Sequence, residues 1–156
     1  MTTTTGFGTT RRVAARLGTI ALALGLLAQN ATAASFFRSV KEPVVVKECG
    51  ACHMVYPPAL LPARSWSKII NDLGNHFGDD ATLPAATQAR ILDFYGRNAG
   101  DGVNGDSWIM RGVRDGVTPA RITKMPFWLG IHGGFGASAF KRTQVRKPGN
   151  CLGCHG

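Results

Sequence analysis

The stretch that decides the fold is the last one, CLGCHG at residues 151–156, because its spacing of two cysteines and a histidine recurs in CGACH at residues 49–53. The 156 residues contain four cysteines, and all four belong to these two C-x-x-C-H motifs. The chemistry of this motif therefore decides what kind of fold the chain can build.

Three chemistries use cysteines at this spacing. A structural zinc site brings together two such pairs that usually lie about 15 to 20 residues apart, whereas 98 residues separate Cys52 from Cys151. A redox-active disulfide needs no following histidine and normally belongs to a thioredoxin-like βαβ pattern, which the sequence does not show. Covalent haem attachment uses both cysteines and the histidine, and we favour it for both motifs.

The spacing suits haem c for a physical reason. Two thioether bonds hold one edge of the porphyrin, the intervening pair of residues follows that edge in a tight turn, and the next imidazole projects onto the iron. We therefore predict two haem c groups with His53 and His155 as iron ligands. The predicted attachment residues are Cys49, Cys52, Cys151 and Cys154.

Each iron also needs a ligand on its opposite face, for which histidine and methionine are the common choices in cytochromes. The chain has four histidines, so His76 and His132 remain for the two irons. Met54 follows His53 directly and cannot reach the far face of the same iron. We predict His76 and His132 as these ligands, with Met110 and Met125 as the alternatives.

The surroundings of the two remaining histidines are apolar. Apolar residues at helical spacing predict a helix over 66–77, which Ser65 caps and Gly78 ends, with His76 on its apolar face. His132 follows the apolar run PFWLGI and precedes a glycine-rich turn. Met125 is the nearest rival of His132, but methionine more often fills core gaps than binds iron.

Two histidines on each iron leave no position open for oxygen, peroxide or nitrite. Haem chemistry on small molecules needs a free or displaceable site, so we predict an electron carrier and not an enzyme. The alternative is a small dihaem peroxidase or reductase with one open iron.

The N-terminal residues predict export. Residues 11–33 combine three arginines, an apolar run over 17–27 and a small-x-small site at 31–33. This pattern is typical of a Sec-type signal peptide, and we predict one over residues 1–33 that is cleaved after Ala33. The alternative is an uncleaved helix that anchors the protein. We expect a periplasmic protein that is not stably inserted in the membrane and binds no nucleic acid.

Charge is unevenly distributed along the rest of the chain. Residues 34–115 contain nine basic and nine acidic residues, whereas residues 116–156 contain six basic residues and no acidic one. This basic segment is either a solvated face or a docking patch for an acidic partner protein.

Helical patterns dominate the remaining sequence. A helix is predicted from Pro84 with Ile91, Leu92 and Tyr95 buried, and another from Thr118-Pro119. The one strand-like pattern is the short PVVV at 43–46. We predict a mostly α fold of small cytochrome c-like lobes around two covalently attached haems, divided into lobes 34–115 and 116–156.

Four stretches resemble a known family: ECGACHMVYPPALLPARSW, LGNHFGDDATL, RITKMPFWLGIH and NCLGCH. They are similar to the bacterial dihaem cytochrome c family, which includes the cytochrome that reduces the oxygen-binding sphaeroides haem protein. The resemblance covers residues 41–155. Family members continue past the second haem motif, whereas this sequence ends at Gly156.

The resemblance implies two bis-histidine haems in two small helical lobes, and the distal histidines of the family match His76 and His132. It also implies a periplasmic carrier between a membrane cytochrome b and a monohaem oxygen-binding cytochrome.

Overall fold

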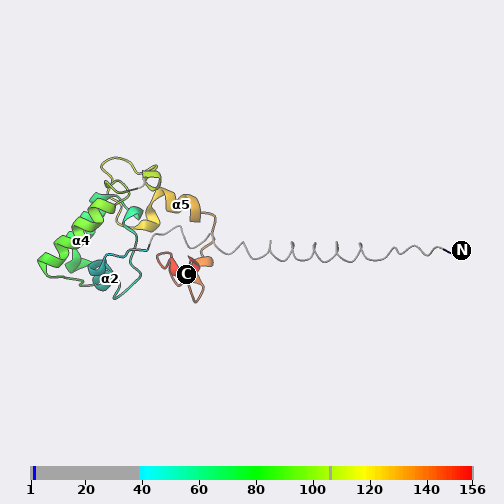
Figure 1. Ribbon diagram of the computed structural model, residues 1–156, viewed down its shortest axis with the longest axis horizontal. Coiled ribbons are helices and arrows are strands. Elements are labelled where there is room, and N and C mark those ends of the chain that lie inside the picture. Colours follow the sequence, from blue (N-terminus) through cyan, green and yellow to red (C-terminus); the bar gives the residue numbers. More distant parts are fainter. Residues whose placement is uncertain (1, 3–38, 106, 156) are drawn as a thin grey trace. The chain divides into compact units, whose positions relative to one another are not determined.

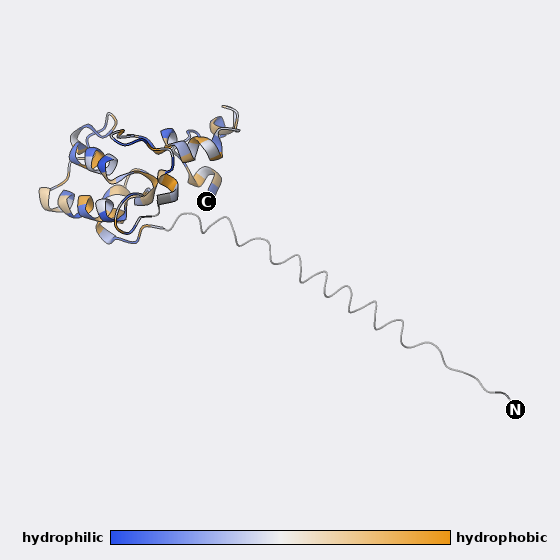
Figure 2. Cartoon of the chain, turned by 90° about the horizontal axis from the view of Figure 1, so that it is seen from above, coloured by the Kyte–Doolittle hydropathy of each residue, from blue (hydrophilic) through white to orange (hydrophobic). Residues whose placement is uncertain are grey.

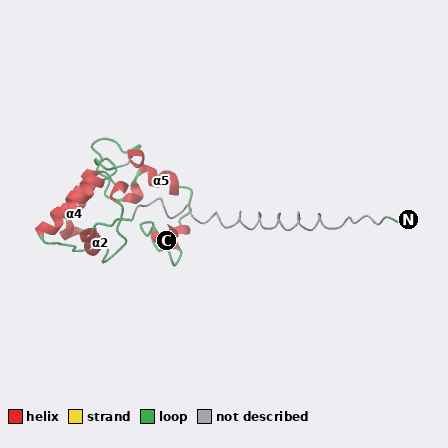
Figure 3. Cartoon of the chain, viewed as in Figure 1, coloured by secondary structure: helices red, strands yellow, loops and turns green. Residues whose placement is uncertain are grey.

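The computed structural model describes residues 2, 39–105 and 107–155, in which five α-helices are joined by loops and short 3-10 turns (Figures 1 and 3). Apart from Thr2, the predicted signal peptide lies outside these residues. The described part contains no strand, only an isolated bridge between His76 and Asp79. The prediction of a mostly α fold is confirmed. The helices are α2 (Pro43–Cys49), α3 (Ala63–Asn71), α4 (Ala85–Asn98), α5 (Pro126–His132) and α6 (Leu152–His155).

The hydrophobic core lies where α2 and α3 pack against α4. Along these helices hydrophobic and hydrophilic residues alternate, as Figure 2 shows, so each helix has one face to bury. The core has buried side chains from all three helices and from the segment that precedes α5: Val45, Trp66, Ile70, Ile91, Tyr95 and Met125.

Two aromatic side chains tie the loop between α2 and α3 to this core. The Trp66 indole donates a hydrogen bond of 2.6 Å to the Pro58 carbonyl, and the Tyr95 hydroxyl donates one of 3.1 Å to the Tyr56 carbonyl. The rings of Trp66 and Tyr95 lie 4.4 Å apart between centroids. Buried indole and phenol groups usually find such partners, and here the partners hold the residues that follow the first cysteine motif.

The predicted helix over 66–77 is wrong at both ends. It begins earlier, as α3, so Ser65 is a buried residue inside the helix and not its cap. It ends before Asp72, whose φ of −120° and ψ of 41° lie outside the helical region. His76 follows the 3-10 turn Leu73–Asn75 and is therefore held by a turn and not by a helix.

Other local predictions had mixed outcomes. The helix predicted from Pro84 is confirmed, because Pro84 directly precedes α4. The strand-like PVVV instead forms the start of α2, where proline suits the first helical position and burial of Val45 outweighs the β-propensity of valine. The helix predicted from Thr118 is wrong: residues 118–121 are not helical, and a 3-10 turn at Ile122–Lys124 leads into α5.

The predicted division into two lobes at residue 115 stays a prediction. Residues on both sides of it belong to a compact unit that spans Phe37–Gly156. The Arg64 guanidinium of α3, for example, donates a hydrogen bond of 2.7 Å to the Val117 carbonyl.

Among the described residues, no helix has the length and apolar character needed to cross a bilayer.

Replacing Val45, whose exposed fraction is 0 %, by alanine should lower the free energy of unfolding by about 2 kcal/mol, because two buried methyl groups leave a cavity. The matched control is Val103→Ala, since Val103 is 86 % exposed and its loss should change stability by less than about 0.5 kcal/mol. Urea unfolding of both holoproteins measures the difference. Equal effects would show that α2 does not belong to the cooperative core.

Candidate haem sites

The first cysteine motif follows the end of α2. Cys49 is the last residue of the helix and is half-buried, while Cys52 and His53 are exposed in the turn that follows. The helix ends with a hydrogen bond of 3.2 Å from the Gly50 amide to the Val46 carbonyl. The motif thus leaves the helix with its second cysteine and its histidine open to a large group.

His53 lies close to His76, and the imidazole centroids are 6.1 Å apart with ring planes at 17°. The Nδ1 atom of His53 lies 2.6 Å from the Met54 carbonyl oxygen. A carbonyl can only accept a hydrogen bond, so Nδ1 carries the proton and Nε2 keeps the lone pair that a metal requires.

His76 has a buried ring nitrogen, Nδ1, for which no hydrogen-bond partner occurs within the described part of the chain. Buried polar atoms are usually paired, so this atom marks a ring that lacks a partner. Burial, helped by the neighbouring His53, lowers the pKa of His76, although Asp79 acts in the opposite direction. A low pKa favours the neutral imidazole, which is the form that binds metals.

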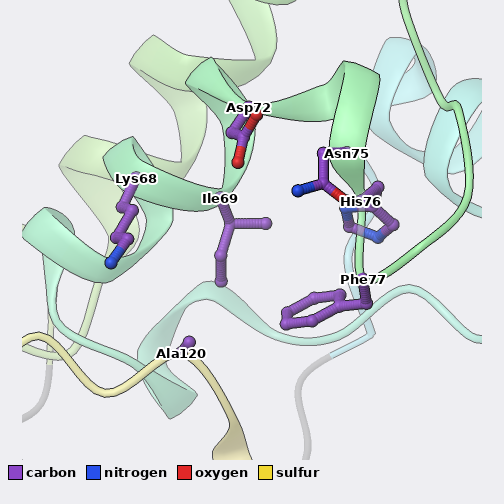
Figure 4. A pocket seen from close by; sticks show the side chains of 7 residues that line it. All are labelled: Lys68, Ile69, Asp72, Asn75, His76, Phe77 and Ala120. Carbon is purple, nitrogen blue, oxygen red and sulfur yellow. The ribbon is translucent and has the colours of Figure 1, made fainter.

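A shallow pocket with a volume of about 210 Å³ lies beside His76, and Figure 4 shows Ile69 and Phe77 pointing into it. Ala120 lies at the opposite wall, so the pocket joins residues far apart in the sequence. Small-molecule sites usually have about 300 Å³ or more, so we take this pocket as apolar space beside His76 and not as a separate site.

The second motif is seated by its own neighbours. The Asn150 side-chain amide donates hydrogen bonds of 3.0 and 3.1 Å to the carbonyls of Gln144 and Val145. At Gly153 the backbones are so close that a Cβ atom would lie 2.6 Å from the Gln144 carbonyl oxygen. Glycine is therefore required at the second variable position of this motif, and α6 is held against residues 144–145.

His132, the last residue of α5, lies close to His155, with centroids 6.2 Å apart and ring planes at 82°. The Nδ1 atom of His132 lies 3.1 Å from the Trp128 carbonyl oxygen, which fixes the proton on Nδ1 as in His53. The Trp128 indole also stacks on the His132 ring, at 4.6 Å between centroids and 12° between planes. The ring of His132 is thus held on two sides.

Both histidine pairs have the spacing that a metal between them needs. A bond of about 2 Å from metal to imidazole nitrogen on each side, and about 1 Å from nitrogen to ring centre, place the two centroids about 6 Å apart. The observed separations are 6.1 and 6.2 Å.

Exposed apolar side chains gather around the same residues. Eight large apolar side chains are exposed in the described part, and six lie within three residues of a motif cysteine or a histidine: Val46, Phe77, Leu129, Ile131, Phe135 and Leu152. Their closeness in sequence to these residues places apolar side chains where an apolar cofactor would be attached. The chain therefore offers what a porphyrin needs, namely cysteines, opposed imidazoles and apolar surface.

None of the four cysteines is in a disulfide. Burial raises the pKa of Cys49, with a further contribution from Glu48, and burial likewise raises the pKa of Cys151. The structure brings no zinc-like cluster together, since groups of three or more candidate ligand side chains are absent from the described residues.

The two alternative methionine ligands lie elsewhere. Met125 is fully buried in the hydrophobic core, and Met110 packs against that core. Both therefore have a packing role that accounts for them.

A sequence model of dihaem cytochrome c matches residues 45–156. The chain belongs to the dihaem cytochrome c family. Among solved structures, a dihaem cytochrome c from Rhodobacter sphaeroides is 39 % identical, with a TM-score of 0.68 over 74 % of this chain and 90 % of that one. A second structure from that organism is 36 % identical, with a TM-score of 0.63 over 75 % and 92 %. A dihaem cytochrome from Shewanella baltica is 31 % identical, with a TM-score of 0.58 over 72 % and 78 %. Among curated protein sequences, none gives a significant match.

Membership of the dihaem cytochrome c family implies two c-type haems, and the pairs Cys49/Cys52 and Cys151/Cys154 fit the attachment motifs. The same membership supports a role in electron transfer, and the family consists generally of electron carriers.

Sequence reasoning missed several residues that shape the two sites. Trp128 precedes His132 by four residues, the spacing at which helical side chains meet, so this contact was open to prediction. Asn150 directly precedes the second motif, but nothing in the sequence indicates its carbonyl partners. The ring of Tyr56 lies 5.2 Å from that of His53. Only the closeness of Tyr56 to the first motif in the sequence could have indicated this contact.

Replacing both cysteines of one motif by serine should remove one haem and leave the other, because each motif is built by a separate segment. The expected products of Cys49→Ser/Cys52→Ser and of Cys151→Ser/Cys154→Ser each carry one haem by pyridine haemochrome assay and intact mass. The control is Met54→Leu beside the first motif, which should keep both haems. A variant that retained two haems would contradict the attachment scheme.

Proposed function

We propose that this dihaem cytochrome c is an electron carrier in which each iron is held between two histidines. His53 and His76 would hold one iron, and His155 and His132 the other. The observation that supports this scheme is the spacing of the two imidazole pairs, 6.1 and 6.2 Å between centroids. The haem supplies the one-electron redox change, and the chain supplies attachment, axial nitrogens and an apolar surround.

Two histidines per iron favour transfer over catalysis. Substrate chemistry at haem needs an open or displaceable position, and this scheme leaves none. Each ring that is tied through Nδ1 to a carbonyl is also restrained against swinging away, as in His53 and His132. The protein is therefore proposed not to be an enzyme.

The proposed location is the periplasm, after removal of a signal peptide over residues 1–33. This location agrees with the sequence pattern of that segment and with covalent haem attachment. The proposed partners are redox proteins, with a membrane cytochrome b as donor and a monohaem oxygen-binding cytochrome as acceptor, as the family resemblance implies.

A basic surface on the C-terminal segment is the proposed docking site. Residues 116–155 contain no acidic residue, and all six basic side chains are exposed: Arg121, Lys124, Lys141, Arg142, Arg146 and Lys147. Charges in this position attract an acidic partner and raise the rate of encounter.

Ligation is tested by spectroscopy of the processed holoprotein. The ferric protein should be entirely low-spin, and the reduced protein should not bind CO rapidly. Because the two pairs differ in ring orientation, 17° against 82°, electron paramagnetic resonance should show two distinct low-spin signals. A high-spin ferric centre, or rapid CO binding at one iron, would instead indicate a dihaem peroxidase or reductase.

Variants identify the distal ligands. His76→Ala and His132→Ala should each open one iron and bind one CO per chain, because each removes one axial nitrogen. Met110→Leu is the matched control for the methionine alternative, since it conserves volume and should leave both irons closed. CO binding by Met110→Leu would show that Met110, and not a histidine, is the second ligand of one iron.

Docking is tested by charge removal. Changing Lys141, Arg142, Arg146 and Lys147 to glutamine should slow electron transfer to an acidic monohaem cytochrome at low salt, with little effect at high salt where charges are screened. The control removes the same number of charges elsewhere, at Lys41, Lys47, Arg90 and Arg111. Equal slowing in both variants would show that only net charge matters.

A further inference from the structure

Tyr56 contacts His53 of the first cysteine motif and Gly149, which lies two residues before the second motif and 93 positions from Tyr56. It belongs to neither motif and to neither pair of histidines. It is one of two tyrosines in the chain, and the other, Tyr95, donates a hydrogen bond to its carbonyl.

On one side, Tyr56 packs on the first motif. Its ring centroid lies 5.2 Å from that of His53, with the planes tilted by 38°. The bond of 3.1 Å from the Tyr95 hydroxyl holds the Tyr56 backbone to the core. The Tyr56 side chain therefore starts from a fixed backbone position and lies against His53.

On the other side, the phenol reaches the segment that directly precedes the second motif. Its hydroxyl donates a hydrogen bond of 2.7 Å to the Gly149 carbonyl oxygen. Cys151 follows Gly149 by two residues, and its Sγ atom lies 3.7 Å from the same oxygen.

We propose that Tyr56 is the positioning residue that sets the distance between the two haems, because its ring packs on His53 while its hydroxyl holds the segment that carries Cys151. This inference rests on the proposed function. It adds a residue that binds no haem itself but spaces the two attachment points. Electron exchange between two centres falls steeply with distance, so a residue that fixes the spacing controls the rate.

The test uses the half-reduced holoprotein and measures electron exchange between its haems by line broadening of haem methyl resonances in nuclear magnetic resonance spectra. Tyr56→Phe keeps the ring and removes the bond to Gly149. Exchange should slow by at most about fivefold, because the loss of one hydrogen bond changes the equilibrium constant between the seated and the released segment by about this factor. Gln88→Leu is the matched control, since it also removes a side-chain hydrogen bond to a backbone carbonyl, the bond of 2.6 Å to Ile70, but touches neither cysteine motif, and exchange should stay near the wild-type rate.

The substitution Gly149→Ala tests the same contact by changing the residue that accepts the hydrogen bond. A Cβ atom at this position would lie 3.3 Å from the Tyr56 hydroxyl oxygen, closer than is comfortable. The substitution should slow exchange in the wild-type background but not in the Tyr56→Phe background, where the crowded oxygen is gone. This double-mutant cycle separates the contact from a general loosening of the fold.

A wild-type exchange rate in Tyr56→Phe, or equal slowing in Gln88→Leu, would overturn the inference. So would additive effects of Gly149→Ala and Tyr56→Phe. Low-spin spectra of the same samples test the proposed function separately, because an open iron would overturn the bis-histidine scheme whatever the exchange rate. If Tyr56→Phe fails to mature, Gly149→Ala alone carries the test, and unchanged exchange in it would refute the contact.

Discussion

The opposed imidazole pairs are the constraint on which the rest of the structure depends. The two rings of each pair, about 6 Å apart, come from different segments of the chain, His76 for His53 and His132 for His155. Each pair can form only if the chain between the two histidines folds back, so that one imidazole lies beside the other. The short turns after α3 and the short helix α5 accomplish this return, and the helical core holds their starting points.

The hydrophobic core accounts for only part of the apolar surface. Buried residues lie mostly between Val45 of α2 and Ala99 at the end of α4, whereas the segment after α5 has few of them among the described residues, such as Val145. Apolar side chains near both motifs instead remain exposed. A chain segment with so little core needs a staple or a cofactor to be stable. The family's covalently attached haems are suited to this role, because they supply apolar mass that the chain lacks.

Backbone strain next to His76 fits this picture. Phe77 has a φ of 60°, in the left-handed region that an aromatic residue rarely adopts. The Arg121 guanidinium lies 4.5 Å above its ring centroid, and the His76 amide donates a hydrogen bond of 2.8 Å to the Asp79 carbonyl. Such outliers persist where surrounding contacts fix them and often lie at functional sites. Here they hold the turn that carries His76.

The sequence by itself determined the haem-attachment motifs, the helical class and the four histidines, because these follow from residue type and short-range spacing. It indicated the family through the resemblance of four longer stretches. It also placed α4 correctly, since Pro84 and the apolar period of that helix are local signals. Only the tertiary structure decided that α3 ends before Asp72, that PVVV is helical, and that Tyr56 reaches Gly149. These features depend on burial and on contacts between distant segments, which local propensity and periodicity do not encode.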